Sequence, residues 1–190
     1  QFNRMADSSF LSPEALVKNT LLLRKKGNIG IAFTYNEPMV GYEYVRDAAQ
    51  LARANGLETV LVTNGCVSLS ALDQVLPYIT AMNIDLKGFC KGYFDYVVGN
   101  FEMTKAFIAK AIPACHVELT TLVVPHHNDG EEMMEEEARW IASIDPKTPL
   151  HLTRYFPRYK EKEAPTPIET LDRLAAIAKR YLFSVYEGNI

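Results

Sequence analysis

The chain has 190 residues, of which 48% are apolar and 23% charged, a composition typical of an ordinary globular domain with one sizeable core. Twenty basic residues against 23 acidic ones give a net charge of −3, which argues against nucleic acid as the main partner because phosphate binding leaves a basic footprint. No apolar run reaches the length of a membrane helix, so no membrane partner is expected.

Helical and strand-like patterns alternate along the whole chain. In chain order we expect a helix at Ser12–Lys26, a strand at Ile29–Tyr35, a helix at Met39–Asn55, a strand at Thr59–Thr63, a helix at Ser70–Tyr78, a strand at Ala81–Lys87, a helix at about Phe101–Ile112, a strand at His116–Val124, a helix at Glu131–Ser143, a strand at Leu150–Phe156, a helix at Pro167–Arg180 and a strand at Leu182–Tyr186.

Several helix ends have recognisable signals. Ser12 followed by Pro13 is typical of an N-cap and first helical residue, and Gly27 can close that first helix. Thr166 and Glu169 have the spacing of a capping box. Strand–helix alternation with short connections predicts an α/β fold with a parallel sheet, either doubly wound or a (β/α) barrel, in one domain covering residues 1–190.

In parallel α/β folds ligands bind at the carboxyl ends of the strands, and polar residues collect there in this sequence. The six predicted ends are Tyr35-Asn36-Glu37-Pro38, Thr63-Asn64-Gly65, Asp85-Leu86-Lys87-Gly88, Val124 to Asp129, Thr153 to Pro157, and Glu187-Gly188-Asn189. The amino-terminal ends are plainer. The asymmetry indicates a small-molecule site at one rim.

Each of these residues also has a structural interpretation. Asp85 and Lys87 lie two apart on a strand and point the same way, either inward as a charged pair or outward into solvent. Glu37 can cap the helix that follows Pro38, and Thr63-Asn64-Gly65 can be a simple turn. Adjacent His126 and His127 are expected to be exposed, and no metal site is predicted.

The polar set suits a zwitterionic ligand that carries a sugar and a base. Glu37 and Asp85 offer carboxylate acceptors for an ammonium group or ribose hydroxyls, while Lys87 offers a cation for a carboxylate or phosphate. Tyr155 and Phe156 offer an aromatic face for a heterocycle.

The ordered series "FTYNEP", "LVTNG", "NIDLKG", "TTLVVP", "HLTRYFP", "PTPIETL" and "YEGN" resembles the radical S-adenosylmethionine (radical SAM) enzymes of the pyruvate formate-lyase activating enzyme-like group, and looks closest to the AmmeMemoRadiSam-system branch. The resemblance covers about Leu11 to Asn189. It implies a partial (β/α) barrel of TIM-like type, and an oxidoreductase that cleaves S-adenosylmethionine at a [4Fe–4S] cluster to a 5′-deoxyadenosyl radical.

The resemblance also implies cofactor-binding residues. Asn36 and Glu37 stand where the family holds the methionyl ammonium, although the family's two glycines before the acid are replaced by Tyr35 and Asn36. Asp85 and Lys87 match the family's Asp-Leu-Lys element, with Lys87 facing the methionyl carboxylate. The remaining positions implied in the cofactor pocket are Thr63, Asn64, Thr120, Thr153 and Phe156. Implied partners are a glycyl-radical enzyme and an electron donor such as flavodoxin or ferredoxin.

The cluster motif C-x-x-x-C-x-x-C is absent from this sequence, whose three cysteines, Cys66, Cys90 and Cys115, are far apart. We therefore expect a fragment that lacks the first barrel strand and the cluster loop, is inactive alone and holds no cluster itself. The cysteines are expected to be reduced thiols in a cytoplasmic protein. Two other functions stay open: a barrel lyase or isomerase that uses Lys87 as Schiff-base nucleophile, and a binding module without catalysis.

Overall fold

A computed structural model describes residues 10–158 and 163–190. Six strands alternate with helices along the chain. The elements are α1 (Pro13–Leu22), η1 (Leu23–Lys26), β1 (Gly30–Phe33), η2 (Pro38–Gly41), α2 (Tyr42–Ala54), β2 (Glu58–Thr63), α3 (Leu69–Val75), η3 (Leu76–Tyr78), β3 (Ala81–Asp85), α4 (Lys91–Tyr96), α5 (Phe101–Ala111), β4 (His116–Val123), α6 (Glu131–Ile144), β5 (Leu150–Arg154), α7 (Ile168–Ala178) and β6 (Val185–Gly188).

All six strands belong to one parallel sheet with the order β1-β2-β3-β4-β5-β6. A doubly wound sheet reverses its strand order at a switch point, whereas a (β/α) barrel adds each strand beside the previous one. The sequential order therefore selects the barrel alternative. Because β1 and β6 are the two edges of an open sheet, the structure is a partial (β/α) barrel, as the sequence indicated.

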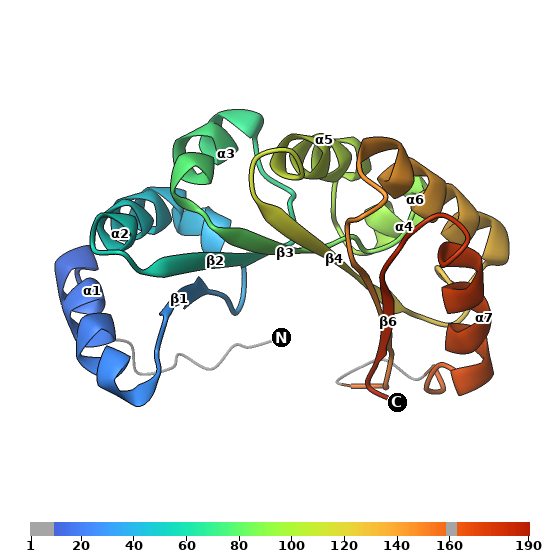
Figure 1. Cartoon of the computed structure of the whole chain (residues 1–190). Helices are drawn as coiled ribbons and strands as arrows, with labels where there is room; N and C mark the ends of the chain where they lie inside the picture. Colours follow the sequence, from blue (N-terminus) through green and yellow to red (C-terminus); the bar gives the residue numbers. More distant parts are fainter. Residues whose placement is uncertain (1–9, 159–162) are drawn as a thin grey trace.

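The sheet arches, and the helices α2, α3, α5, α6 and α7 cover its convex side (Figure 1). Alternate strand residues point to that side and most of them are buried; Leu61, Ile84, Leu119 and Leu152 are fully buried. These side chains pack with the inner faces of the helices into one main hydrophobic core. The concave side of the arch has no covering helix among the described residues (Figure 1).

Local sequence signals predicted where most of the helices and strands lie. The Ser12 hydroxyl accepts a hydrogen bond from the Ala15 N–H at 3.3 Å, and Gly27 ends the first helical segment with a φ of 87°. The capping box was predicted wrongly, because the Thr166 hydroxyl donates to the Val123 carbonyl at 2.6 Å instead of capping α7. That contact ties the start of α7 to the carboxyl end of β4.

Two elements differ most from expectation, and β1, β3 and β5 each end two residues earlier than expected. The short helix α4 was not predicted, since only two of its residues, Tyr93 and Phe94, are buried and six residues are too few for a periodic pattern. The last strand starts at Val185 instead of Leu182 and runs to Gly188. α4 matters for function, because it stands beside the carboxyl ends of the strands.

Candidate functional site

The Glu37 carboxylate joins the ends of the first two strands. Its Oε1 accepts hydrogen bonds from the Met39 N–H at 3.0 Å and from the Thr63 hydroxyl at 2.7 Å. Its Oε2 accepts one from the Asn64 N–H at 2.8 Å. Glu37 thus caps η2, as one interpretation of the sequence proposed, and also binds the loop after β2. A carboxylate has about four acceptor sites, so these three bonds leave about one, on Oε2, for a ligand.

The backbone before Glu37 takes a conformation that usually requires glycine. Tyr35 and Asn36 have φ values of 63° and 51°, in the left-handed region. Asparagine tolerates that region, but a bulky aromatic residue there is uncommon. These are the two positions where the resembling family has glycines, and this chain forms a left-handed turn there with two other residues. The turn also explains why β1 ends at Phe33 rather than Tyr35.

The turn formed by Thr63, Asn64 and Gly65 packs closely against neighbouring side chains. Gly65 has a φ of 65°, and a Cβ there would lie 3.2 Å from Ile84 Cγ2. The Asn64 side-chain oxygen accepts from the Cys66 N–H at 2.8 Å, while the Thr63 hydroxyl is buried and accepts from the Gly65 N–H at 3.2 Å. Since the side chain of Asn64 is used locally, its backbone N–H is the group that fixes Glu37.

Asp85 and Lys87 form the charged pair that their spacing predicted. Lys87 Nζ donates to Asp85 Oδ2 at 2.5 Å, and both side chains are about one-third exposed, at 34% and 37%. They alternate with Ile84 and Leu86, which are fully buried against the helices. The pair therefore lies on the concave side, at the carboxyl end of β3.

A cavity of about 300 Å³ brings several of these groups together. Glu37, Asn64, Cys66 and Lys87 line it from the strand ends. Its other wall is apolar and comes from η2, from α4 and the turn after it, and from α5 through Val40, Phe94, Val97, Val98, Gly99 and Thr104. Mixed polar and apolar walls of this size are typical of a site for a small organic ligand.

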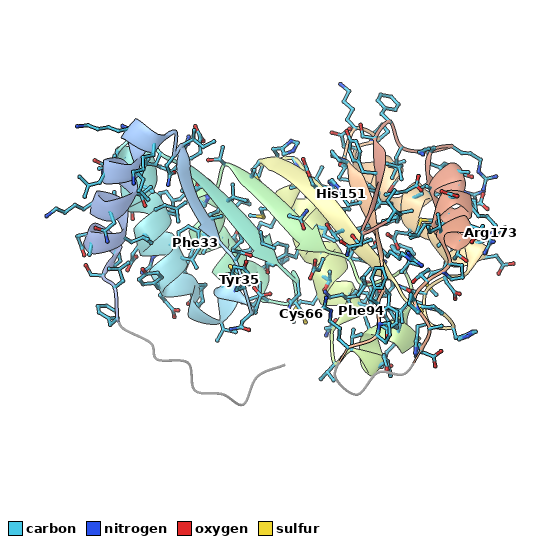
Figure 2. All side chains as sticks on the ribbon, turned by 90° about the horizontal axis from the view of Figure 1, so that it is seen from below. Phe33, Tyr35, Cys66, Phe94, His151 and Arg173 are labelled. Carbon is cyan, nitrogen blue, oxygen red and sulfur yellow. The ribbon has the colours of Figure 1, made fainter. Side chains whose placement is uncertain are left out.

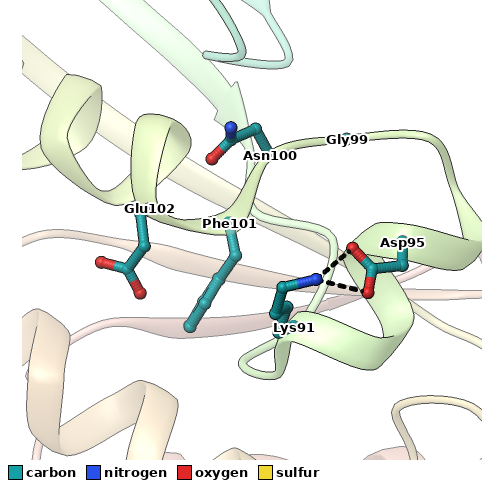
Figure 3. Close-up of a pocket in the computed structure, with 6 residues that line it drawn as sticks. All are labelled: Lys91, Asp95, Gly99, Asn100, Phe101 and Glu102. Carbon is teal, nitrogen blue, oxygen red and sulfur yellow. Dashed lines mark hydrogen bonds and ion pairs between the residues drawn. The ribbon is translucent and has the colours of Figure 1, made fainter.

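A second pocket, of about 140 Å³, lies on the segment that connects α4 and α5 (Figure 3). Its charged residues Lys91 and Asp95 are paired with each other, with Nζ–oxygen distances of 2.8 and 2.6 Å. None of the predicted site residues lines it. We therefore assign the candidate site to the cavity that Glu37 and Lys87 line.

Further predicted residues lie on the concave face. Asp85, Thr120 and His151 are register partners on neighbouring strands, and Thr153 follows two residues after His151 on the same face. The Thr120 hydroxyl donates to Asn83 Oδ1 at 3.0 Å. Figure 2 looks into this face: Tyr35, Cys66 and Phe94 lie along the carboxyl ends of the strands, and His151 lies farther from those ends. Phe156 follows β5, is 43% exposed and has the Arg154 guanidinium 4.8 Å from its ring.

A polar cluster inside the concave face, away from the strand ends, was not predicted from the sequence. Glu118 Oε1 lies 3.0 Å from Nε2 of His116, and its Oε2 lies 2.7 Å from Nε2 of His151. These contacts, that of His116 first, hold the pKa of Glu118 below its ordinary value. The signal was available, because polar residues at every second position of His116–Thr120 and His151–Thr153 predict a polar strand face.

Behind the sheet, Glu137 of α6 is buried, and desolvation raises its pKa to about 8. The Thr121 hydroxyl oxygen lies 2.6 Å from Glu137 Oε1 and 2.8 Å from the Leu86 carbonyl. One hydroxyl proton cannot serve two acceptors. A protonated Glu137 resolves this, since it donates to Thr121, which then donates to Leu86, the neighbour of Lys87.

The cysteines do not form a metal site. Among residues 10–158 and 163–190, no group of three or more His, Cys, Asp or Glu residues could hold a metal ion. Cys66 and Cys90 lie near the carboxyl rim, whereas Cys115 precedes β4 at the other end, where burial raises its pKa to about 11. The residues present therefore do not fit a [4Fe–4S] cluster, which needs several thiolates around one centre. No helix of the described residues is both long and apolar enough to cross a membrane.

Comparisons with known proteins identify the family to which this chain belongs. The sequence profile of the Radical SAM superfamily matches residues 1–141. An uncharacterised protein of Methanocaldococcus jannaschii, MJ0808, is 36% identical, and the match covers 85% of this chain and 49% of that protein. The chain thus spans about half the length of this curated relative.

Solved structures share the fold at low identity. A domain of pyruvate-formate lyase-activating enzyme from Bacteroides vulgatus has a TM-score of 0.71 and 19% identity, over 84% of this chain and 99% of that one. A radical SAM methyltransferase from Sphaerobacter thermophilus has a TM-score of 0.71 and 13% identity, over 93% and 57%. TYW1 with a lysine-pyruvate adduct has a TM-score of 0.67 and 13% identity, over 94% and 66%.

Proposed function

The chain belongs to the radical SAM superfamily, and we propose that its carboxyl-end rim binds S-adenosylmethionine for the radical chemistry of that family. The observation that carries the proposal is the single cavity that both Glu37 and Lys87 line. A carboxylate and an ammonium suit the two ends of an amino acid: Glu37 binds the methionyl ammonium and Lys87 the methionyl carboxylate.

The remaining residues have supporting roles in this proposal. Oε2 of Glu37 takes the ammonium, because the three hydrogen bonds from Met39, Thr63 and Asn64 leave it an acceptor site and fix its direction. Thr120 and Asp85 serve the ribose from the concave face, Thr153 and Phe156 the adenine, and Asn36 the outer side of the turn.

In the radical SAM family S-adenosylmethionine is the source of the radical chemistry, and a [4Fe–4S] cluster held by other residues would supply the electron for it. The described residues of this chain do not fit such a cluster, so the chain's own contribution is to bind and orient the cofactor. By analogy with the resembling activating enzymes we propose a glycyl-radical enzyme as partner, flavodoxin or ferredoxin as electron donor, and a cytoplasmic location that suits three free thiols.

The lyase alternative is disfavoured by one contact. A Schiff-base lysine must lose its proton before it attacks a carbonyl group. Lys87 donates to Asp85 at 2.5 Å, and a carboxylate at that distance stabilises the protonated amine. Borohydride trapping with carbonyl compounds tests this alternative, and we expect no adduct on Lys87.

The proposed function is tested by product formation. The complete gene product that contains this chain is reconstituted anaerobically with iron and sulfide, reduced with dithionite and assayed for 5′-deoxyadenosine from S-adenosylmethionine. We expect formation of 5′-deoxyadenosine that Glu37→Gln strongly reduces and Glu43→Gln, on the exposed first turn of α2, does not. A complete gene product that takes up no cluster, or an unaffected Glu37→Gln variant, would refute the proposal.

A further inference from the structure

The concave face of the sheet carries polar side chains that nothing in the described chain covers. Parallel sheets are normally packed on both faces and therefore apolar on both. Here the concave positions of β4 and β5 are His116, Glu118, Thr120, Leu122, His151 and Thr153; all but Leu122 are polar, and none of them is buried. A polar, open face in a parallel sheet indicates a chamber for a polar ligand.

Within this chamber His151 lies in line with the residues assigned to the cofactor. Register pairs connect Asp85 to Thr120, Thr120 to His151, and His151 to Tyr186, so the four residues form one row across β3, β4, β5 and β6. Neighbouring strands lie about 4.8 Å apart, which places His151 about one strand from Thr120. It also lies two residues, about 6.6 Å, before Thr153 along β5.

The His151 ring is held on two sides. Its Nε2 lies 2.7 Å from Glu118 Oε2, and its ring stacks on that of Tyr186 with centroids 5.1 Å apart and an interplanar angle of 26°. An imidazole oriented by a carboxylate is an arrangement that proteins use to hold or exchange a proton at the other ring nitrogen.

The protonation state of Glu118 fixes the tautomer of His151. The neighbouring imidazoles hold the pKa of Glu118 below its ordinary value, so near neutral pH the group is a carboxylate and can only accept hydrogen bonds. Nε2 of His151 must therefore carry a hydrogen atom. Nδ1 is the nitrogen that remains for a ligand, as an acceptor in the neutral ring and a donor in the imidazolium.

We propose that His151 is a substrate-contacting residue of this enzyme and that its Nδ1 holds an acidic oxygen group of the substrate, a carboxylate or a phosphate. The inference deepens the proposed radical SAM function and rests on it. In the bound state the imidazolium donates from Nδ1 to the oxyanion and from Nε2 to Glu118. Glu118 is the positioning residue, with both oxygens turned to imidazole rings, and Tyr186 offers an aromatic face to the rest of the substrate.

The proton balance gives a pH dependence. The oxyanion binds the imidazolium, so the complex contains one proton more than a neutral ring and a free anion. The titratable and charged groups around the ring are Glu118 and His116 on β4, Tyr186 on β6 and the Asp85–Lys87 pair on β3. Anion binding therefore takes up a proton and strengthens as the pH falls.

The test is an NMR titration of the 190-residue chain labelled with ¹⁵N-histidine, which has four imidazole rings. The probes are acetate and inorganic phosphate, with sodium chloride at equal ionic strength as reference, at about pH 6 and about pH 8. We expect the His151 ring signals to shift saturably with at least one probe, and this probe to bind more tightly at the lower pH. Whichever probe binds more tightly identifies the carboxylate or the phosphate class.

Two variants complete the experiment. Glu118→Gln removes the charge that orients His151 and is expected to weaken binding of the probe at least about tenfold. The backbone spectrum of the variant shows that the fold persists. His126→Gln is the matched control, since His126 is exposed on the loop after β4 and far from this cluster in the chain, and it should leave the response unchanged. Parallel, non-saturating shifts of all rings, a pH-independent response or no shift at His151 would overturn the inference.

This outcome is independent of 5′-deoxyadenosine formation, which the proposed function predicts. Cofactor cleavage without a His151 response refutes the inference alone. Failure of cofactor cleavage in the complete gene product refutes the proposed function, whatever the result of the acetate and phosphate titrations.

Discussion

The Glu37 carboxylate and the Thr63 hydroxyl, which lie on the loop after β1 and at the end of β2, are joined by a 2.7 Å hydrogen bond. The bond helps to fix the Glu37 carboxylate in the wall of the cavity that it lines with Lys87, because Thr63 is buried and its own position is set by the sheet. A charged acceptor held in advance costs a ligand less ordering entropy on binding.

We predict that Thr63→Val weakens S-adenosylmethionine binding by about tenfold, because valine keeps the shape of threonine and removes the donor that orients Glu37. Thr63→Ser keeps the hydroxyl and should bind within about twofold of the wild type. Isothermal calorimetry measures both. Equal affinities for the valine and serine variants would show that this hydrogen bond does not orient the acid.

The left-handed turn before Glu37 gives a stability prediction. Tyr35 has a φ of 63° and is 88% exposed, so its side chain gains little from packing while its backbone is strained. Tyr35→Gly should stabilise the protein by about 1 kcal/mol in urea unfolding, since glycine adopts this conformation without a steric penalty. Tyr35→Ala, which keeps the Cβ, should gain nothing. A glycine variant no more stable than the alanine variant would contradict strain at this position.

The buried carboxyl group of Glu137 leads to a prediction of how the stability of the protein varies with pH. Its folded-state pKa of about 8 lies above the ordinary carboxyl value of 4.5, so the folded protein binds a proton that the unfolded chain has released. The contribution of Glu137 to the free energy of unfolding is therefore fully present below about pH 4.5. It is lost as the pH rises through about 8, which lowers the free energy of unfolding by roughly 3–6 kcal/mol. Urea midpoints across this range measure the loss.

Glu136, the residue before Glu137, supplies the control for this prediction. Glu137→Gln keeps a donor for Thr121 and should remove most of the decline with pH, while Glu136→Gln, on the exposed side of α6, should retain it. A decline that persists in the Glu137→Gln variant would assign it to other groups.

Much of the fold was predictable because local chemistry and tertiary structure agree. Ser12, Gly27 and the alternation of apolar strands with helices gave the α/β class, and the carboxyl ends located the rim. Strand order was not predictable from periodicity, since a doubly wound sheet and a barrel share the same pattern. The resemblance to a family, carried by motifs such as "FTYNEP", supplied the barrel, and the sequential strand order confirms it.

The site was predictable in part. The pairing of Asp85 with Lys87 follows from their spacing on a strand, and it is present. The second role of Glu37, as acceptor for Thr63 and Asn64, depends on which strands are neighbours and needed coordinates. Thr166 had the spacing of a cap but binds Val123, because a buried carbonyl group at the end of β4 competes for its hydroxyl. Tertiary hydrogen bonds of this kind leave no local sequence signal.

The central claim is that Glu37 at this rim holds the ammonium of S-adenosylmethionine, and calorimetry on the reconstituted complete gene product tests it most directly. S-adenosylmethionine is titrated into the wild type, Glu37→Gln and Glu43→Gln, with unfolding midpoints recorded to confirm that each variant is folded. We predict affinity lower by about ten- to hundredfold for Glu37→Gln and unchanged for Glu43→Gln. A folded Glu37→Gln variant that binds as tightly as the wild type would contradict the claim.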